Sequence, residues 1–289
     1  MRTWNFVKGH GTENDFVILL DRHGMIDPTP AEVRFLCDRR AGIGADGVMR
    51  ATWAKHISDW DGDPDIWFMD YRNADGSVAE MCGNGSRAFA RFLLDQGLAD
   101  GPELRIGTRN GVRDITVRPD GQFTVAMGVV TLGEEATVRV ADLERPAGFA
   151  EVGNPHAVAV FDKYTDLAGF DLFHTPHWRP AGQADWIEAK QFPEGTNVEL
   201  VVPVGERHVA MRVYERGVGE TRSCGTGTVG VAAVMGADIA EEHDWRIDVP
   251  GGTVHVHLGP ATAGARESWL TGPAVMVAHG EVTVPDDLS

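Results

Sequence analysis

The sequence has little cysteine, an excess of acidic over basic residues, and no long apolar run. Three cysteines in 289 residues are too few for a disulfide scaffold. With 26 basic and 43 acidic residues, the net charge of −17 argues against a nucleic-acid partner or an anionic membrane surface. No apolar stretch approaches the roughly 20 residues of a membrane helix, and the first residues lack a signal-peptide apolar region. We therefore expect a soluble cytoplasmic protein with reduced thiols.

Two of the three cysteines lie in a stretch that occurs twice. Residues 81–92 read MCGNGSRAFARF and residues 223–234 read SCGTGTVGVAAV. Cys82 and Cys224 are 142 positions apart, and Asn14 and Asn154, which each precede a β-like run, are 140 apart. A repeat of this length exceeds the roughly 20–50 residues of a solenoid unit. The sequence therefore predicts two duplicated domains that meet near residue 131.

The repeated stretch predicts a cysteine at the start of a buried helix. Glycines after the cysteine allow a tight turn with exposed N–H groups, and Ser86 and Thr228 are candidates to cap the helix that follows. Both following segments are apolar nearly all round, which is typical of a buried helix. A helix N-terminus favours a thiolate and attracts an anion. We therefore expect each half of the chain to form a sheet wrapped around a central helix.

Local patterns predict further elements. Thr29 to Glu32 form a capping box with proline at the first helical position, and the helix that follows is expected to end at Arg39-Arg40. Cys37 on it is expected to be a small buried hydrophobe. Residues 42–47 are expected to form a structural loop and residues 53–66 a surface insertion. Strands are expected at 4–7, 15–20, 67–71, 103–107, 112–118, 122–127, 245–249, 253–258 and, more weakly, 268–270.

Two thiols at helix N-termini indicate a particular chemistry if a pseudo-twofold relates the halves. The thiols then address opposite faces of one carbon next to a carboxylate. One thiolate removes the α-proton, the opposite thiol delivers a proton, and the helix ends hold the carboxylate. This inverts the carbon without a cofactor.

Several polar residues are candidates to serve that site. His156 could relay a proton near a thiol, or it could be a strand-edge histidine bonded to backbone. Glu215 and Arg216 precede Cys224 on a glycine-rich loop, where they could equally form a solvated ion pair. Four asparagines lie in turns that contain glycine or proline, where asparagine is also common for backbone reasons: Asn14, Asn73, Asn154 and Asn197.

Six stretches carry a likeness to a known family: GHGTENDF at 9–16, YRNADGS at 71–77, MCGNG at 81–85, GNPH at 153–156, GTNVE at 195–199 and ERGVGETRSCGTG at 215–227. The chain resembles diaminopimelate epimerase, in the right order over nearly its whole length. The resemblance implies interconversion of LL- and meso-2,6-diaminopimelate without pyridoxal phosphate, on the route to lysine and peptidoglycan. It also implies an α+β fold of two pseudo-symmetric domains, 1–131 and 132–275, with residues 276–289 returning to the first.

The resemblance also assigns roles by position. Catalytic roles fall on Cys82, Cys224, His156 and Glu215. Substrate-binding roles fall on Asn14, Asn73, Gly83, Asn84, Asn154, Asn197, Glu215, Arg216, Gly225 and Thr226. Gly47 is a departure, because some members carry a glutamine there that touches substrate. We expect a small-molecule substrate, no metal, and a homodimer.

Three rival interpretations are open. Residues 225–230 fit the dinucleotide pattern G-x-G-x-x-G, but no strand directly precedes the first glycine. A metal-binding module would need ligand spacing that the cysteines and histidines lack. A proline racemase-like isomerase would share the paired thiols, but the Glu215-Arg216 stretch and the four asparagines favour diaminopimelate.

Overall fold

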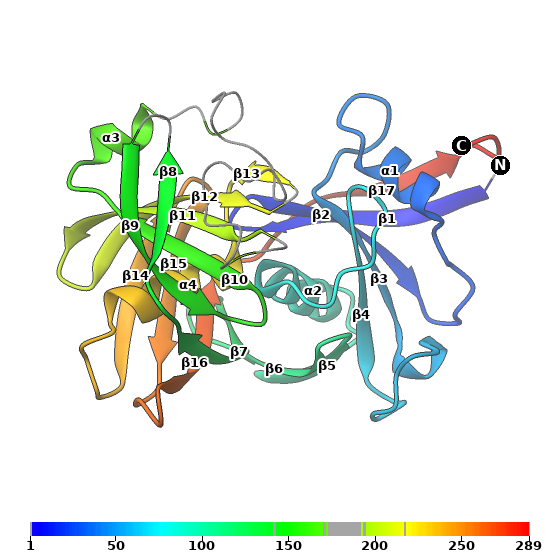
Figure 1. Cartoon of the computed structure of the whole chain (residues 1–289). Helices are drawn as coiled ribbons and strands as arrows, with labels where there is room; N and C mark the ends of the chain where they lie inside the picture. Colours follow the sequence, from blue (N-terminus) through cyan, green and yellow to red (C-terminus); the bar gives the residue numbers. More distant parts are fainter. Residues whose placement is uncertain are drawn as a thin grey trace. The chain divides into compact units, whose positions relative to one another are not determined.

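The computed structural model describes residues 2–140, 143–169, 172, 192, 195–216 and 218–288. The chain divides into two compact units: unit 1 is Met1–Val125 with Gly272–Ser289, and unit 2 is Ala126–Thr271. Each unit consists mainly of strands around one long helix (Figure 1). The domain limits at 131 and 275 stay a prediction.

Unit 1 is a sheet around the helix α2, Gly83–Asp95, with two shorter helices, α1 Pro30–Cys37 and the 3₁₀ turn η1 Ala54–His56. Its strands are β1 Arg2–Gly11, β2 Asn14–Asp21, β3 Gly47–Trp53, β4 Trp67–Asn73, β5 Glu103–Thr108, β6 Gly111–Val117 and β17 Val275–Val284. The pairs β17–β1, β1–β2, β3–β4 and β5–β6 are antiparallel, and β2–β3 and β4–β5 are parallel. The helix α2 packs against β1, β2, β6 and β17, so the sheet curves around it.

Unit 2 repeats this plan around the helix α4, Gly225–Met235, with a short helix α3 Tyr164–Ala168. Its strands are β8 Ala136–Val140, β9 Leu143–Glu151, β10 Pro155–Val160, β11 Asn197–Gly205, β12 His208–Glu215, β13 Gly219–Thr221, β14 His243–Val249, β15 Gly252–Leu258 and β16 Ala265–Gly272, and β7 Phe123–Leu132 leads into them. The pairs β9–β10, β11–β12 and β14–β15 are antiparallel, and β10–β11 and β12–β14 are parallel. The alternation from β9 to β15 is the same as that from β1 to β6.

Buried side chains hold the helices α2 and α4 inside their sheets. Phe89 and Phe92 of α2 are fully buried, and each contributes about 1.5–3 kcal/mol relative to an exposed side chain. The exposed side of α2 is confined to its last turns, where Arg91 and Asp95 form an ion pair. In α4 the segment Val229–Ala233 is buried throughout. The burial expected of both helices is therefore confirmed.

Two local predictions are wrong. The helix α1 begins with the expected capping box but ends at Cys37, before the two arginines. The 53–66 segment is not a surface insertion throughout, because Ala54 and Ile57 are buried against Phe68. This contact could not be predicted from the sequence, because the aspartates between these apolar residues make the segment look hydrophilic.

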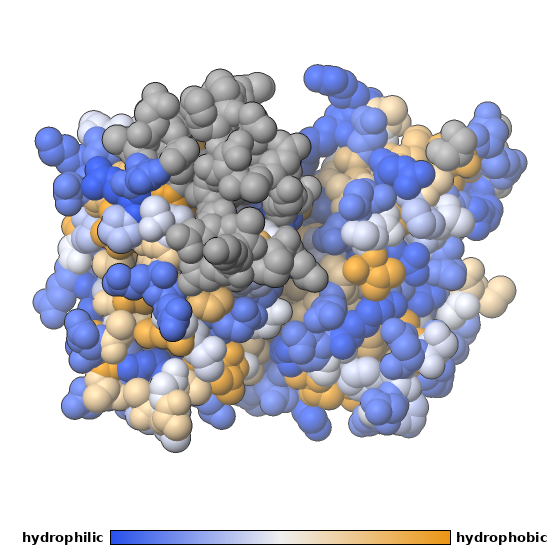
Figure 2. Space-filling model, in the orientation of Figure 1, coloured by the Kyte–Doolittle hydropathy of each residue, from blue (hydrophilic) through white to orange (hydrophobic). Residues whose placement is uncertain are grey.

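Hydrophilic side chains cover most of the face in Figure 2, with apolar residues scattered among them. This agrees with the acidic composition of the chain. In the described part of the chain, every helix is too short or too polar to cross a membrane.

A buried ionic cluster fixes β3 to β4. Asp70 is fully buried and lies 2.8 Å from Arg50 Nε and 2.7 Å from Arg109 Nη1. Burial opposes ionisation, but the charges of Arg109 and Arg50 outweigh it and lower the pKa of Asp70. A carboxylate with a lowered pKa stabilises the fold above its unfolded pKa of about 3.9, and this contribution is lost as pH falls through the folded value.

We expect Asp70→Asn to lower the free energy of unfolding by about 3–5 kcal/mol near neutral pH, because it leaves buried cations without their anion. The variant should also lose less stability than the wild type between neutral pH and acid. Urea unfolding across this pH range measures both effects. Asp114→Asn removes an exposed partner of Arg105 and should change stability by less than about 1 kcal/mol. Equal loss in the two variants would contradict the role of the cluster.

Candidate active site

Cys82 and Cys224 are the N-cap residues of α2 and α4. The Cys82 sulfur accepts the backbone N–H of Gly85 at 3.3 Å, and the Cys224 sulfur accepts that of Gly227 at 3.4 Å. A β-carbon at either glycine would lie only 3.3 Å from the β-carbon of its own cysteine. The motif therefore favours glycine three residues after the cysteine. The expected position of both cysteines at helix N-termini is confirmed.

The caps themselves differ from the prediction. Ser86 and Thr228 lie inside the first helical turn rather than before it. Ser86 Oγ donates to the Cys82 carbonyl at 3.0 Å, and Thr228 Oγ1 donates to the Gly225 carbonyl at 2.7 Å. The sequence favoured the hydroxyls because serine and threonine are common caps, and the cysteine sulfur took that position instead.

In unit 1, Asn14 joins Cys82 to an acidic residue. Asn14 Nδ2 donates to Asp46 Oδ2 at 2.7 Å, which turns the amide oxygen the other way. That oxygen accepts hydrogen bonds from Asn84 Nδ2 at 3.3 Å and from the Cys82 thiol at 3.6 Å. The structure thus brings Cys82, Asn14 and Asn84 together, and Asp46 orients the amide that faces the thiol.

Asp46 belongs to the glycine-rich turn that was expected to be only structural. Burial and the neighbouring charge of Asp15 raise the pKa of Asp46, although the bond from Asn14 opposes this. Arg39 bonds both carboxylates, at 2.7 Å to Asp15 and 2.8 Å to Asp46, and Lys8 lies 2.7 Å from Asp15. Two cations therefore balance two carboxylates beside Asn14.

Asn73 is not part of this group of contacts. At the end of β4 its Nδ2 donates to Ser77 Oγ at 3.0 Å. Gly47 pairs with Asn73 across β3 and β4, and a β-carbon there would lie 2.5 Å from both the Arg72 carbonyl and the Tyr71 ring. This backbone leaves no room at position 47 for a glutamine side chain.

Arg87, one turn into α2, is fully buried. Its Nη2 donates to Asn84 Oδ1 at 2.9 Å and to Thr12 Oγ1 at 3.1 Å, and its Nε donates to the Pro273 carbonyl at 3.3 Å. Burial lowers the pKa of Arg87 to about 10, and negative charge at Cys82 opposes this. The guanidinium therefore remains charged at neutral pH beside the candidate thiol.

In unit 2, His156 is fully buried between two oxygen atoms. Its Nδ1 lies 2.7 Å from Glu199 Oε1, and its Nε2 lies 2.9 Å from Asn154 Oδ1. With both nitrogens facing oxygens, an imidazolium ion paired with the Glu199 carboxylate satisfies both bonds. Gly230 of α4 packs on the ring, where its β-carbon would lie 3.2 Å from His156 Cβ.

Asn197 joins the ends of three strands of unit 2. Its Nδ2 donates to the Pro155 carbonyl at 3.1 Å, and its Oδ1 accepts the Arg216 backbone N–H at 2.9 Å. Arg216 Nη1 in turn reaches the Gly195 carbonyl at 3.5 Å. Asn154, Asn197 and Arg216 thus lie on connected loops at one end of β10, β11 and β12.

Acidic residues surround the second thiol. Burial, with the charges of Glu215 and Glu199, raises the pKa of Cys224 well above its ordinary value, although bonds to Thr226 and Gly227 oppose this. Thr226 Oγ1 lies 3.5 Å from Cys224 Sγ. Glu215 also accepts a hydrogen bond from Thr221. Cys224, Thr226, Glu215 and the His156–Glu199 pair therefore form one electrostatic group.

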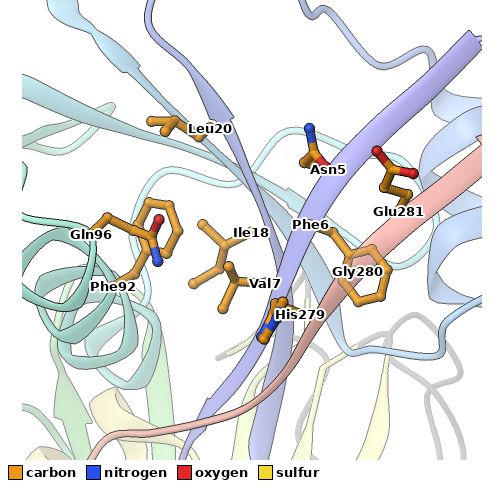
Figure 3. Close-up of a pocket in the computed structure, with 10 residues that line it drawn as sticks. All are labelled: Asn5, Phe6, Val7, Ile18, Leu20, Phe92, Gln96, His279, Gly280 and Glu281. Carbon is orange, nitrogen blue, oxygen red and sulfur yellow. The ribbon is translucent and has the colours of Figure 1, made fainter.

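A cavity of about 350 Å³ in unit 1 lies away from Cys82 (Figure 3). Phe92 of α2 and Gln96, the residue that follows the helix, face residues of β1, β2 and β17 there. Ten residues of helix separate Cys82 from Phe92, a rise of about 15 Å. The cavity contains none of the residues expected in the active site. Within the described residues, no cluster of three or more His, Cys, Asp or Glu side chains is arranged to hold a metal ion.

Solved structures share this fold. The chain superposes on a Bacillus anthracis phenazine biosynthesis protein of the PhzF family with a TM-score of 0.72, 16% identity, and coverage of 98% of this chain and 100% of the other. It superposes on a hydroxyproline epimerase from Agrobacterium vitis with a TM-score of 0.69, 17% identity, and coverage of 99% and 94%. The fold is the pseudo-symmetric two-domain fold found in epimerases, as the sequence predicts.

Sequence comparison identifies the family. The diaminopimelate epimerase family model matches residues 6–133 and 148–277. The diaminopimelate epimerase of Streptomyces coelicolor is 47% identical, over 96% of this chain and 94% of the relative. That of Thermobifida fusca is 46% identical, over 96% and 97%. The chain belongs to the diaminopimelate epimerase family.

Four residues of the site were missed at the level of sequence: Thr12, Asp46, Arg87 and Glu199. Glu199 lies in one of the stretches that resemble the family, and its place in a strand of apolar residues is a usable signal, because a buried glutamate needs a partner. Arg87 lies in a mostly apolar helical run, which is a second signal of the same kind.

We expect Cys37 to resist iodoacetamide in the folded protein. Burial raises the pKa of Cys37 to about 12, and it packs among the apolar residues around α1. Mass spectrometry of tryptic peptides should find Cys37 unlabelled at mildly alkaline pH and fully labelled in urea. Cys82, which is partly exposed, is the internal control. Labelling of Cys37 at the same rate as Cys82 would contradict its burial.

Proposed function

We propose that this chain interconverts LL- and meso-2,6-diaminopimelate without a cofactor, on the route to lysine and peptidoglycan precursors. Family membership supports diaminopimelate as the substrate, since curated relatives named diaminopimelate epimerase align over nearly the whole chain. The observation that carries the mechanism is the repeated cap: in each unit a cysteine sulfur begins a buried central helix.

In the proposed reaction one cysteine is the base and the other is the acid, and the two roles are reversed when the reaction runs in the other direction. The thiolate of one cysteine removes the α-proton, so a C–H bond breaks and an S–H bond forms. The thiol of the other cysteine then donates its proton to the opposite face of the same carbon. The N–H groups of the helix ends, at Gly83-Asn84 and Gly225-Thr226, hold the carboxylate while negative charge grows on it. Atoms and charge balance without a redox partner.

The other polar residues divide between the thiols and the substrate. We assign His156 and Glu215 to tuning the thiols. The pairing of His156 with Glu199 supports this, as does the effect of Glu215 on Cys224. Substrate binding falls to Asn14, Asn73, Asn154, Asn197 and Arg216. A dicarboxylate substrate needs a second anion site beyond the helix ends, and Arg216 is the cation that the proposal places there.

A proline racemase-like activity is the second candidate. A probable proline racemase from Agrobacterium radiobacter shares the fold with a TM-score of 0.63 and 16% identity. Proline has no distal amino-acid group. The loops that carry Asn197 and Arg216 therefore favour the longer substrate.

Two properties of the assembly belong with the proposal. We propose a homodimer, which light scattering of the purified chain measures directly. We propose a cytoplasmic location, supported by the acidic composition and the small number of cysteines.

An isotope experiment tests the two-thiol mechanism. In deuterated water, early in the reaction from LL-diaminopimelate, the meso product should carry deuterium at the inverted carbon, and recovered substrate should carry almost none. The reason is that the abstracting thiol retains the substrate proton while the opposite thiol arrives equilibrated with solvent. Mass spectrometry of both isomers at low conversion measures the label.

Cys82→Ala and Cys224→Ala should each abolish inversion, and L-proline should not be racemised by the wild type. Substantial label in recovered substrate would indicate a single base. Racemisation of proline in place of diaminopimelate would favour the second candidate.

Arg216→Met should raise KM for diaminopimelate about 10- to 100-fold, the loss expected for a hydrogen-bonded charge of about 1.5–3 kcal/mol. The matched control is Arg246→Met, which removes an exposed arginine of the same unit that pairs with Asp248. Steady-state kinetics with thermal melting separates binding from folding. Kinetics equal to the control would remove Arg216 from the substrate site.

A further inference from the structure

Among the residues that the structure describes, no carboxylate pairs with the buried cation of Arg87. Its side chain is fully buried, and its hydrogen-bond acceptors within the described residues are the neutral oxygens of Thr12, Asn84 and Pro273. Its Nη1 has no hydrogen-bond partner in that part of the chain. Buried charges are normally paired, because desolvation is costly. A neutral side chain could tie these segments together at lower cost, so structure alone does not account for an arginine here.

The charge of Arg87 is present in only one of the two repeats. Five residues after Cys82 the chain has Arg87, and five residues after Cys224 it has Val229. In unit 2 the charged groups near the thiol come from strands instead, as Glu199 on β11 and Glu215 on β12. The helix dipole is the same for both cysteines, because both are N-caps. The difference between the thiols therefore comes from side chains.

Arg87 also holds a strained turn beside the thiol. Thr12 and Glu13, between β1 and β2, have φ of 49° and 60°. A β-branched residue is rare in this left-handed region and persists where its surroundings enforce it. The bond from Arg87 Nη2 to Thr12 Oγ1 is such a constraint, and Asn14 follows two residues later. The same Nη2 bonds Asn84, which bonds the Asn14 oxygen that faces Cys82.

We propose that Arg87 is the positioning residue of the first thiol: its buried guanidinium orients Asn84 and the Thr12 turn and makes Cys82 the more readily ionised of the two thiols. This inference rests on the proposed function, since it assigns the starting roles of the two thiols in that reaction.

The remaining charges agree with this assignment. Near Cys82, the pairs of Lys8 and Arg39 with Asp15 and Asp46 balance one another. The other titratable groups on the adjoining segments are His10, Glu13 and Glu80. Near Cys224, the charges of Glu215 and Glu199 both oppose ionisation of the thiol, and His156 pairs with Glu199. Among the flanking arginines, Arg212 pairs with Glu220, Arg216 donates to the Gly195 carbonyl, and Arg222 donates to the Pro250 carbonyl.

The experiment measures thiol chemistry rather than turnover. Iodoacetamide alkylation of Cys82 and Cys224 is followed by peptide mass spectrometry across pH, in the full chain without substrate. The variants are Arg87→Gln, which removes the charge, and Arg87→Lys, which keeps it. The matched control is Arg91→Met on the same helix, where the arginine is exposed and pairs with Asp95. Thermal melting reports stability separately.

In the wild type, Cys82 should be alkylated before Cys224, with a midpoint below the value of about 8.5 for a free cysteine. Arg87→Gln should raise the Cys82 midpoint by about one pH unit, which slows alkylation near neutral pH about tenfold. Arg87→Lys should keep the low midpoint, and Arg91→Met should match the wild type. A merely structural role would lower the melting temperature of Arg87→Gln without moving the midpoint.

An unmoved midpoint in folded Arg87→Gln overturns the proposal, and so does a wild type in which Cys224 reacts first. If Arg87→Gln does not fold, the alkylation midpoints of Cys82 and Cys224 in the wild type and that of Cys82 in Arg87→Lys decide the matter, because the order of alkylation also depends on the burial of Cys224. Neither readout uses diaminopimelate. A protein that lacks epimerase activity yet shows the shift would therefore refute the proposed function and leave the charge assignment in place.

Discussion

The bond from a helix backbone N–H to the cysteine sulfur that begins the helix is the constraint on which each unit depends. It places the thiol at the positive end of a buried helix, where the N–H groups of the first turn attract an anion. It also favours glycine at the third helical position, because a β-carbon there would press on the cysteine. The sheet must then wrap this helix, since its first turns are buried on nearly every face. The repeated motif is therefore the origin of both the chemistry and the architecture.

The two units share one order of strand pairing but differ in the charged residues around their thiols. The strands from β1 to β6 and from β9 to β15 alternate antiparallel and parallel pairs in the same order. Asn14 and Asn154 begin or precede equivalent strands, yet the residue two positions later is Phe16 in one unit and His156 in the other. Phe16 is an apolar core residue, and His156 holds a buried glutamate. Each thiol thus has the same helix behind it and a different electrostatic environment.

The sequence predicted what local chemistry determines. Turn glycines, the capping box at Thr29 and the cysteine motif are read from a few adjacent residues, and they placed α1, α2 and α4. It did not predict what tertiary contact determines. Asp46 lies in a turn that reads as a loop, and only the pairing of β2 with β3 brings it to Asn14. The sequence favours Ser86 and Thr228 as caps because it does not show at which residue each helix begins. The helices begin directly after the cysteines, so the thiols are the caps.

The difference between the thiols has a consequence for a reversible inversion. An epimerase with one thiolate and one thiol has two protonation forms, and each form accepts one configuration of the α-carbon. Turnover converts one form into the other, and exchange with solvent returns it. The charge of Arg87 and the carboxylates around Cys224 shift the balance between these forms, but they leave the equilibrium between the isomers unchanged, because a catalyst does not alter it. The bias therefore affects how the enzyme divides between its two free forms. The direction whose proton donor is Cys224 begins from the favoured form, and the reverse direction begins from a form that must first be populated.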